Sequence, residues 1–283
     1  MKVEEKLDMA GANTDKDAPE SVVEVEELGP PSSARNILWI VRLVSIFIVV
    51  VGWEIFGHQI NPLFMSYPSA IAKAAVGLAA SGELFTALQS SLRTLLVGFI
   101  LASAIGTALG LLIGRYRIVD AATDWLVNAL YATPLVAIIP LVTLWLGLGD
   151  AAKLFIVAIL AVFPVLINTA AGVRNVPSML IDVGDAFAAN ERQVFLKIVL
   201  PAALPYMMTG LRLGIGRAII GMVVAEFFTA ITGLGAMIVK YGNAYDTASM
   251  FVPILLLMLM GVGITSLVRK IESMIAPWRA SDE

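Results

Sequence analysis

The sequence predicts an all-α membrane protein with about six transmembrane helices. Of its 283 residues, 59% are hydrophobic and 14% are charged, whereas a soluble domain has about 45–50% apolar and about 25% charged residues. The apolar residues gather in runs of about 20, the length that a helix needs to cross the bilayer core. The chain has no cysteine and a single histidine, His58. Disulfides are therefore excluded, little is left for metal binding or acid–base catalysis, and we expect no cofactor.

The first 35 residues differ from the rest, and they predict a disordered acidic tail ahead of a membrane domain over residues 36–280. The tail lacks the basic start and short apolar core of a cleavable signal peptide. Low hydrophobicity and clustered acids favour disorder. The acids are Glu4, Glu5, Asp8, Asp15, Asp17, Glu20, Glu24, Glu26 and Glu27.

Six apolar runs are long enough to span a bilayer. A short helix near residues 71–80 is expected in the loop after the first span. The predicted spans are 37–56, 92–113, 125–146, 154–171, 211–230 and 251–268.

Lysine and arginine distribution sets the predicted orientation, because cytoplasmic loops carry an excess of both. With the N-terminus inside, the outer segments hold only Lys73, Lys153 (near a span end) and Lys240. Both chain termini and the loop after the fourth span are then cytoplasmic. The inner segments hold Arg35, Arg115, Arg117, Arg174, Arg192, Lys197, Arg269, Lys270 and Arg279.

Small residues recur at helical spacing in two spans. Span two has one at every fourth position, and span five has a shorter series. Such ridges allow close backbone contact between helices, within one chain or with a second copy. The two series are Gly98, Ala102, Gly106, Gly110 and Gly114, and Gly210, Gly214, Gly216 and Gly221.

The third span contains Pro134 and Pro140, which should distort it because each removes a backbone donor. Carbonyls freed in this way are tolerated where they are buried in protein or line a cavity. The prolines either shape the bundle or mark a transport path. The candidate path-lining residues are Asn128, Thr133, Pro134, Pro140, Thr143 and Glu226.

Two acids, Glu54 and Glu226, fall within predicted spans. An ionisable group there is costly and is a functional candidate by default. Both lie toward the outer side, where an interhelical hydrogen bond is the favoured role over substrate or proton binding. Arg212, at the inner end of span five, is expected to reach the interface or to pair with an acid of the preceding loop.

The segment 182–205 is polar in an otherwise apolar chain, and it lies within a predicted cytoplasmic loop over about residues 173–208. Such a segment must contact water or a protein partner, because lipid cannot satisfy its polar groups. Its composition predicts two short helices separated at Asn190, with Pro201 and Pro205 leading into the next span.

This loop resembles the coupling loop of bacterial ABC-importer permeases, in which E-A-A precedes a glycine and a hydrophobic-x-L-P ending. The E-A-A positions fall on Asp182, Val183 and Gly184, the glycine position falls on Ala188, and the ending matches residues 195–205. The proline-containing third span and the A-E-F around Glu226, followed by G-L-G, also resemble this family. The resemblance covers about residues 36–280 and is strongest to permeases for nitrate, sulfonates, taurine and related small anions or pyrimidines.

The resemblance implies a type I permease in the bacterial inner membrane that assembles as a homodimer. A cytoplasmic ATPase dimer would bind the loop, and an extracytoplasmic solute-binding protein would deliver the substrate. A helix over about residues 182–189 would dock on the ATPase. The implied coupling residues are Asp182, Gly184, Asp185, Ala188, Asn190, Arg192 and Pro201.

The alanine at position 188 departs from the family pattern. Glycine tolerates the backbone angles of a sharp bend, so the bend between the two short helices is in doubt. Asn190 is an alternative for it, because asparagine visits left-handed geometry.

No phosphate-binding G-x-x-x-x-G-K-[S/T] occurs, so ATP hydrolysis is expected on a separate subunit and the chain is not expected to be an enzyme. No basic patch suggests nucleic-acid binding. One alternative is a proton- or sodium-coupled secondary transporter that uses Glu226 or Glu54, and another is a non-transporting membrane scaffold.

Overall fold

The structure is a computed structural model that describes residues 32–229 and 231–275, with side chains described from residue 37 to residue 274. The chain divides into two compact units, residues 1–49 and 50–283. The first unit contributes the beginning of helix α1 (Ser32–Gln59). Residues 32–35 therefore belong to this helix and not to the tail, and residues 1–31 of the predicted tail lie outside the described part.

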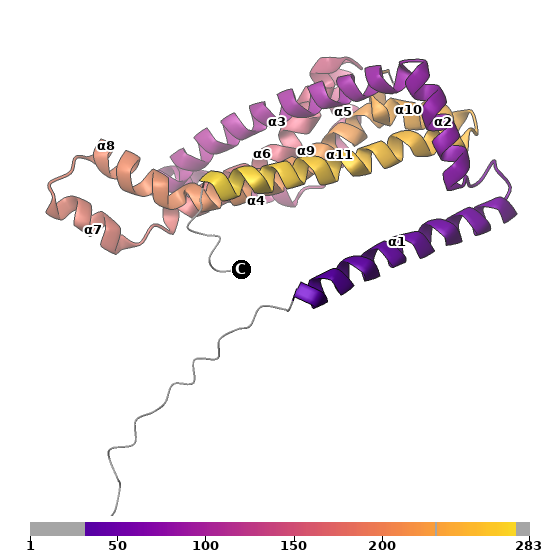
Figure 1. Ribbon diagram of the computed structural model, residues 1–283. Coiled ribbons are helices and arrows are strands. Elements are labelled where there is room, and N and C mark those ends of the chain that lie inside the picture. Colours follow the sequence, from indigo (N-terminus) through magenta and orange to yellow (C-terminus); the bar gives the residue numbers. More distant parts are fainter. Residues whose placement is uncertain (1–31, 230, 276–283) are drawn as a thin grey trace, which may run out of the picture. The chain divides into compact units, whose positions relative to one another are not determined.

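In the described residues every regular element is helical, as the composition predicts. Five of the described helices are long and apolar enough to cross a membrane, and a bent pair counted as one span brings the number to six. In the second unit the long helices are α3 (Glu83–Arg115), α6 (Asp150–Arg174), α9 (Leu200–Thr229) and α11 (Thr247–Ile275). They run side by side (Figure 1). Two shorter helices, α2 (Pro68–Ala80) and α10 (Leu234–Asn243), lie near one end of this bundle.

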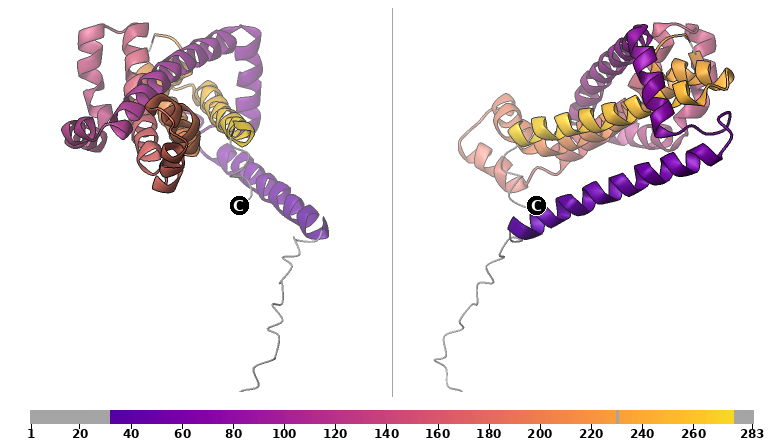
Figure 2. Two further views of the ribbon diagram at one scale, coloured as in Figure 1. Left: turned by 90° about the vertical axis from the view of Figure 1, so that its left-hand side faces the viewer. Right: turned by 45° about the vertical axis from the view of Figure 1, so that its right-hand side comes forward.

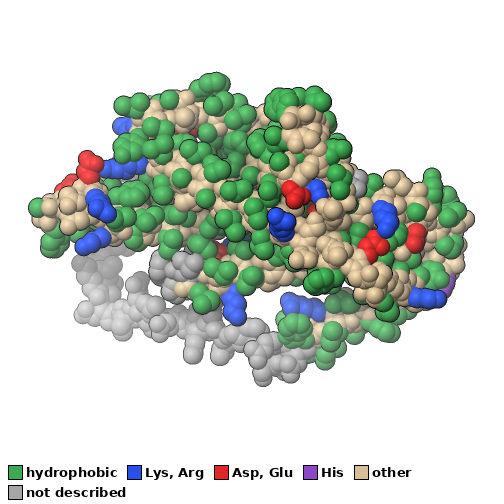
Figure 3. All heavy atoms as spheres, turned by 90° about the horizontal axis from the view of Figure 1, so that it is seen from above, with side chains coloured by type: hydrophobic (Ala, Val, Ile, Leu, Met, Phe, Trp, Pro, Cys, Tyr) green, Lys and Arg blue, Asp and Glu red, His purple; other side chains and the backbone are tan. Residues whose placement is uncertain are grey.

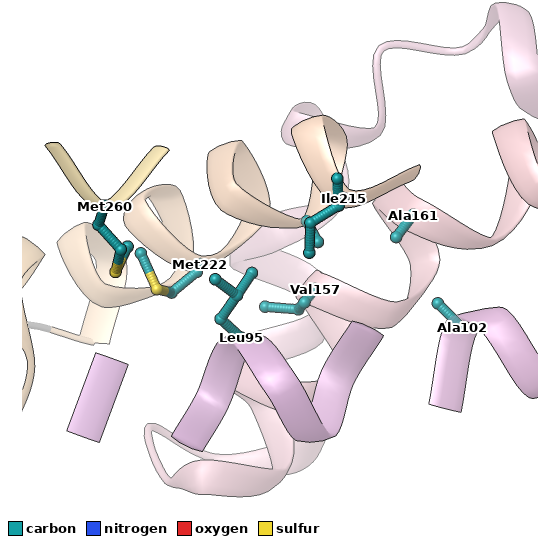
Figure 4. Packing of buried hydrophobic residues seen from close by; sticks show 8 residues of the cluster. Leu95, Ala102, Val157, Ala161, Ile215, Met222 and Met260 are labelled. Carbon is teal, nitrogen blue, oxygen red and sulfur yellow. The ribbon is translucent and has the colours of Figure 1, made fainter. Parts of the chain in front are cut away.

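The core of the bundle forms where α6 lies between α3 and α9. Leu95 of α3, Val157 of α6 and Met222 of α9 are all fully buried and belong to one cluster. Figure 4 shows their side chains meeting between the helices, with Met260 of α11 at the edge. The apolar runs of three predicted spans thus build one interior.

The small-residue ridges explain how closely these helices approach. A Cβ on Gly110 would lie 2.6 Å from Cβ of Thr169, and one on Gly114 would lie 2.6 Å from Cβ of Val173, so α6 packs on the backbone of α3. The same helix meets the second ridge, because a Cβ on Gly214 would lie 2.8 Å from Cγ2 of Val165. Gly216 is the exception, with nothing within 4 Å. The predicted ridges therefore pack within this chain.

The third predicted span is broken. Helix α4 (Arg117–Ala132) is followed by a 3-10 turn, η1 (Leu135–Ile138), and by α5 (Ile139–Leu146). The two halves are bent by 83°. The break falls at Thr133 and Pro134, since proline disfavours helical geometry in the residue before it. The expected distortion is confirmed, and it is larger than a kink.

The end of α1 is tied to the start of α2 by Glu54. Its carboxylate accepts hydrogen bonds from Ser69 N (3.0 Å) and Ser69 Oγ (2.7 Å), so it satisfies a free donor in the first turn of α2. His58 lies 3.1 Å from the same carboxylate and stacks on Tyr67. His58 is therefore part of α1 and of this contact.

Candidate functional site

The polar segment forms a helical hairpin between α6 and α9. It contains α7 (Ser178–Ala186), α8 (Glu191–Val194) and a π-helical turn, η2 (Phe195–Val199). The hairpin projects beyond the end of the bundle, as Figures 1 and 2 both show. Two short helices were predicted here, but the first covers 178–186 and not 182–189.

The turn between the two short helices has the backbone of a Schellman motif, a C-terminal cap that normally requires glycine. Ala188 N donates to Asp185 O (2.9 Å) and Ala189 N donates to Gly184 O (3.0 Å). Ala188 has φ of 49°, the left-handed conformation. The bend is thus at the position where the resembling family has glycine, and alanine adopts the strained geometry.

Asn190 has a different role from the expected one. Its φ of −75° and ψ of 163° are extended, so it does not supply the left-handed bend. Its Oδ1 accepts from Gln193 N, and Gln193 Oε1 accepts from Asn190 N, both at 2.9 Å. This reciprocal capping box starts α8 and fixes the register of the second short helix.

The π-turn joins the hairpin to α9 without a gap. Leu200 N donates to Phe195 O, five residues earlier. Pro201 follows directly, and a proline ring collides with the carbonyl four residues before it in a regular α-helix. The wider turn provides room for the ring. Residues 191–229 therefore form one continuous apolar helical span.

One side of α7 presents apolar side chains at helical spacing to the outside. Phe187 is 83% exposed and Met179 is 69% exposed, with Val183 between them. Asp182, Asp185 and Arg192 of α8 are also exposed. Figure 3 shows charged side chains at the same end of the molecule. The opposite side of α7 carries the buried Gly184. An exposed apolar row bordered by acids suits a protein partner more than water.

The predicted path residues are not all brought together. Thr133, Pro134 and Pro140 are exposed at the break and on α5, and Asn128 of α4 is exposed as well. The hydroxyls of Thr133 and Thr143 donate back to the carbonyls of Ala129 and Pro140. Glu226 is fully buried on α9, and its carboxylate accepts hydrogen bonds from other elements.

Glu226 belongs to a polar cluster at the end of the bundle away from the hairpin. Its carboxylate accepts from Ser91 Oγ of α3 (2.8 Å) and from Gly235 N of α10 (2.8 Å). Lys153 of α6, 1% exposed, donates to Oγ1 of Thr232 at 2.7 Å. From the sequence, Lys153 was expected at a span end. In the sequence Lys153 is a lysine directly before an apolar run, and this pattern does not distinguish an interfacial side chain from a buried one.

Two further ionic contacts join distant helices. Arg212 pairs with Glu272 of α11, so of its two expected roles the pairing with an acid of the preceding loop is wrong. Near the Glu226 cluster, Lys240 Nζ lies 2.7 Å from Glu83 Oε1 at the rim of an open pocket of about 360 Å³. The hydrogen bond to Glu83 raises the pKa of the Lys240 ammonium.

The sequence model of one family, described as the inner membrane component of binding-protein-dependent transport systems, matches residues 106–276. This chain belongs to that family. The permease is therefore a multi-pass inner-membrane transport subunit and not an enzyme. The matched residues begin in α3 and include the whole hairpin, α9 and α10.

Individual relatives agree with this assignment. The permease is 35% identical over 241 residues to a putative ABC transporter permease protein of Methanocaldococcus jannaschii, covering 82% of this chain and 89% of the relative. It is 32% identical to a protein of Bacillus subtilis named putative aliphatic sulfonates transport permease protein SsuC, covering 87% of this chain and 90% of the relative. It is also 32% identical to the nitrate import permease protein NrtB of Leptolyngbya laminosa, covering 69% and 70%.

Solved structures support the fold. The permease resembles a chain of the methionine ABC transporter MetNI in an inward-facing conformation, with a TM-score of 0.57. The likeness covers 70% of this chain and 98% of that chain at 20% identity. The helical bundle with its projecting hairpin thus has a type I permease-like fold.

Proposed function

We propose that the permease is the membrane subunit of an ATP-driven importer for a small oxyanion of the sulfonate or nitrate class. Relatives named for sulfonate and nitrate transport are 32% identical to it over the 247 and 194 residues that align. The substrate reaches it from an extracytoplasmic binding protein. Two copies form a homodimer, and both chain termini face the cytoplasm.

The observation that carries the mechanism is the exposed apolar row of α7 on a hairpin continuous with α9. We infer that α7 docks in a groove of a cytoplasmic ATPase subunit. Phe187 and Val183 enter the groove, and Asp182, Asp185 and Arg192 surround the contact. Because residues 191–229 form one continuous helical span, displacement of α7 by the closing ATPase dimer moves α9 and switches the path between its inward- and outward-facing states.

Two phenylalanines can be used to test on which side of the membrane the hairpin lies. Phe187 lies on the hairpin and Phe85 at the start of α3, at the other end of the bundle, with exposed fractions of 83% and 68%. Because the chain has no cysteine, each becomes a single labelling site as Phe187→Cys or Phe85→Cys. A membrane-impermeant maleimide should label Phe85→Cys in intact cells and Phe187→Cys only in inverted vesicles. Labelling of Phe187→Cys from outside would sink the coupling role.

The same positions test the ATPase contact. Phe187→Ser should reduce co-purification of the ATPase subunit and ATP-dependent uptake, while the amount of permease in the membrane stays normal. Phe85→Ser removes an equally large exposed ring at the other end and should leave co-purification unchanged. Equal loss in both variants would mean that exposed apolar area, and not α7, holds the partner.

The alternative of a proton- or sodium-coupled transporter is not supported by any contact of the two acids. Glu54 accepts hydrogen bonds from the first turn of α2, and Glu226 from Ser91 and Gly235. Both carboxylates thus have structural partners. Uptake that collapses with an uncoupler but survives depletion of ATP would favour that alternative.

A further inference from the structure

Two opposite charges are buried at the end of the bundle away from the hairpin. Lys153 of α6 is 1% exposed and Glu226 of α9 is fully buried. A buried charge is tolerated only where hydrogen bonds replace the water that it has lost. The groups that donate or accept those hydrogen bonds must therefore stay next to each charged side chain.

Both charges are solvated by one short segment of the chain. Lys153 Nζ donates to the carbonyl (3.1 Å) and to Oγ1 (2.7 Å) of Thr232, in the turn between α9 and α10. Glu226 Oε2 accepts from Gly235 N at 2.8 Å, three residues further on. The α9–α10 turn, defined here as residues 231–235 and so including the first two residues of α10, is thus held from α6 and from α9 at once.

Two serines of α3 attach the same turn from a third side. Ser91 Oγ donates to Glu226 and accepts from Leu234 N at 2.8 Å, so the hydroxyl joins the carboxylate to the turn backbone. The neighbouring Ser90 Oγ lies 3.1 Å from Oγ1 of Thr232. Three long helices therefore meet at this turn through polar contacts.

Two glycines let the turn lie directly on α9. A Cβ on Gly233, whose φ is 105°, would overlap the carboxylate of Glu226. A Cβ on Gly235 would lie 2.8 Å from Cβ of Glu226 and 3.0 Å from Val223 O. The turn backbone fills the space next to the acid and leaves none for a side chain.

We propose that Lys153 and Glu226 are positioning residues that keep the α9–α10 turn closed on α3, α6 and α9 throughout the transport cycle. Opening the turn would remove both acceptors that the described residues offer to Lys153, on Thr232, and would leave Glu226 only the Ser91 hydroxyl as a donor. The three helices and the turn therefore move as one body, and the changes that open and close the path occur elsewhere. Neither charge binds substrate. The inference rests on the chain being a transport permease, and not on the substrate or sidedness proposed above.

A reversible cross-link tests whether the turn stays closed. The oxygens of Ser90 and Thr232 are in hydrogen-bond contact, so Ser90→Cys combined with Thr232→Cys brings two thiols together in a chain without other cysteines. Lys153 keeps the Thr232 carbonyl as a partner in this variant. We expect oxidation to form the disulfide and uptake to equal that of the reduced protein. Uptake that is lost on oxidation and restored by a reductant would overturn the proposal, because the turn would then have to move.

A rescue experiment tests whether Lys153 acts through the turn. Lys153→Met should lower uptake at unchanged abundance. When Ser90→Cys and Thr232→Cys are added to that variant, oxidation of the two thiols should restore uptake. A purely packing role of Lys153 would show no dependence on oxidation. Failure of the disulfide to restore uptake in a folded protein would overturn the assignment. If Lys153→Met does not accumulate in the membrane, the cross-link experiment in the protein that keeps Lys153 is the test of the proposal.

Lys240 provides the matched control. It lies at the same end of the bundle, but its side chain is 60% exposed and it pairs with Glu83. Lys240→Met should leave uptake nearly unchanged and independent of the disulfide. If Lys240→Met lost as much uptake as Lys153→Met, the cause would be the removal of positive charge at this end of the molecule. That result would contradict a positioning role specific to Lys153.

Discussion

Gly184 of α7 packs directly against Ile198 of the π-turn. A Cβ at Gly184 would lie 2.9 Å from Cδ1 of Ile198 and 3.2 Å from Cγ2 of Val194. This contact holds the two arms of the hairpin together at the buried position of α7. Because the π-turn continues into α9, a force on α7 is carried through this contact as well as through the backbone.

Replacing Gly184 with leucine should separate the arms. Gly184→Ala needs only a small shift at the flexible end of Ile198, whereas Gly184→Leu cannot be accommodated without moving α7, because overpacking forces backbone shifts. We expect Gly184→Leu to abolish most ATP-dependent uptake at normal abundance. The control is Gly77→Leu in α2, where nothing lies within 4 Å of the added Cβ. Normal uptake by Gly184→Leu would show that this contact does not transmit force.

The left-handed Ala188 predicts an order among substitutions. Alanine with positive φ costs about 1–2 kcal/mol, asparagine and glycine tolerate it, and a β-branched residue is a true outlier there. Ala188→Gly and Ala188→Asn should keep uptake, and Ala188→Val should lower it by altering the angle between α7 and α8. Transport assays in vesicles with the ATPase subunit check the order. Full activity of Ala188→Val would contradict a role for this bend.

The close packing of the small-residue ridge of α3 on α6 predicts that a larger residue at Gly110 lowers the stability of the fold. Gly110→Ala places a methyl group 2.6 Å from Thr169 Cβ and 2.7 Å from Leu166 O, and the second contact is with rigid backbone. Overpacking of this kind costs about 1–3 kcal/mol. The melting temperature of the purified permease should fall. Gly261→Ala in α11, with nothing within 4 Å, should leave it unchanged or slightly raised. Similar melting temperatures for the two variants would contradict the packing of α3 on α6.

A comparison of alanine substitutions at Gly233 and Gly82 distinguishes the cost of steric overlap from the cost of backbone strain. Both have positive φ, 105° and 76°, but only Gly233 would place a Cβ against the Glu226 carboxylate, whereas Gly82 has open space. Each alanine substitution should cost at least about 1–2 kcal/mol through the backbone. Gly233→Ala should lose more, because it also displaces a buried charge from its partners. Thermal unfolding of both variants measures the difference, and equal losses would contradict the close approach of the turn to α9.

Glu54 supports the start of α2, and it predicts a stability effect without a transport effect. Glu54→Ala leaves Ser69 N without its acceptor, a loss of about 1 kcal/mol, typical of a removed cap. Glu54→Gln keeps an acceptor oxygen and the size of the side chain. Uptake by Glu54→Gln should remain driven by ATP and insensitive to an uncoupler. Loss of uptake by a stable Glu54→Gln protein would support the secondary-transport alternative.

Several features of this permease follow from local sequence. The spans, the hairpin after α6 and the small-residue ridges were predictable, because apolar length and helical spacing are properties of contiguous residues. A distortion of the third span was also predictable from its two prolines, although its place at Pro134 and the 83° bend were not. The bend depends on how α5 packs against α6 and α9 and not on the proline alone.

Which residues meet across the bundle follows from packing and not from any local pattern. Ser91 and Glu226 are 135 positions apart, and Lys153 and Thr232 are 79 apart. In the sequence Lys153 has the properties of an interfacial residue, and the packing of the helices buried it.

The composition of the hairpin likewise predicted a bend but not its residue. The hydrogen bonds that cap both short helices place Ala188 in the left-handed conformation and leave Asn190 extended. The reason is that backbone groups at helix ends must find partners whatever side chain is present, so the fold around the turn, and not the residue type, sets the backbone angles there.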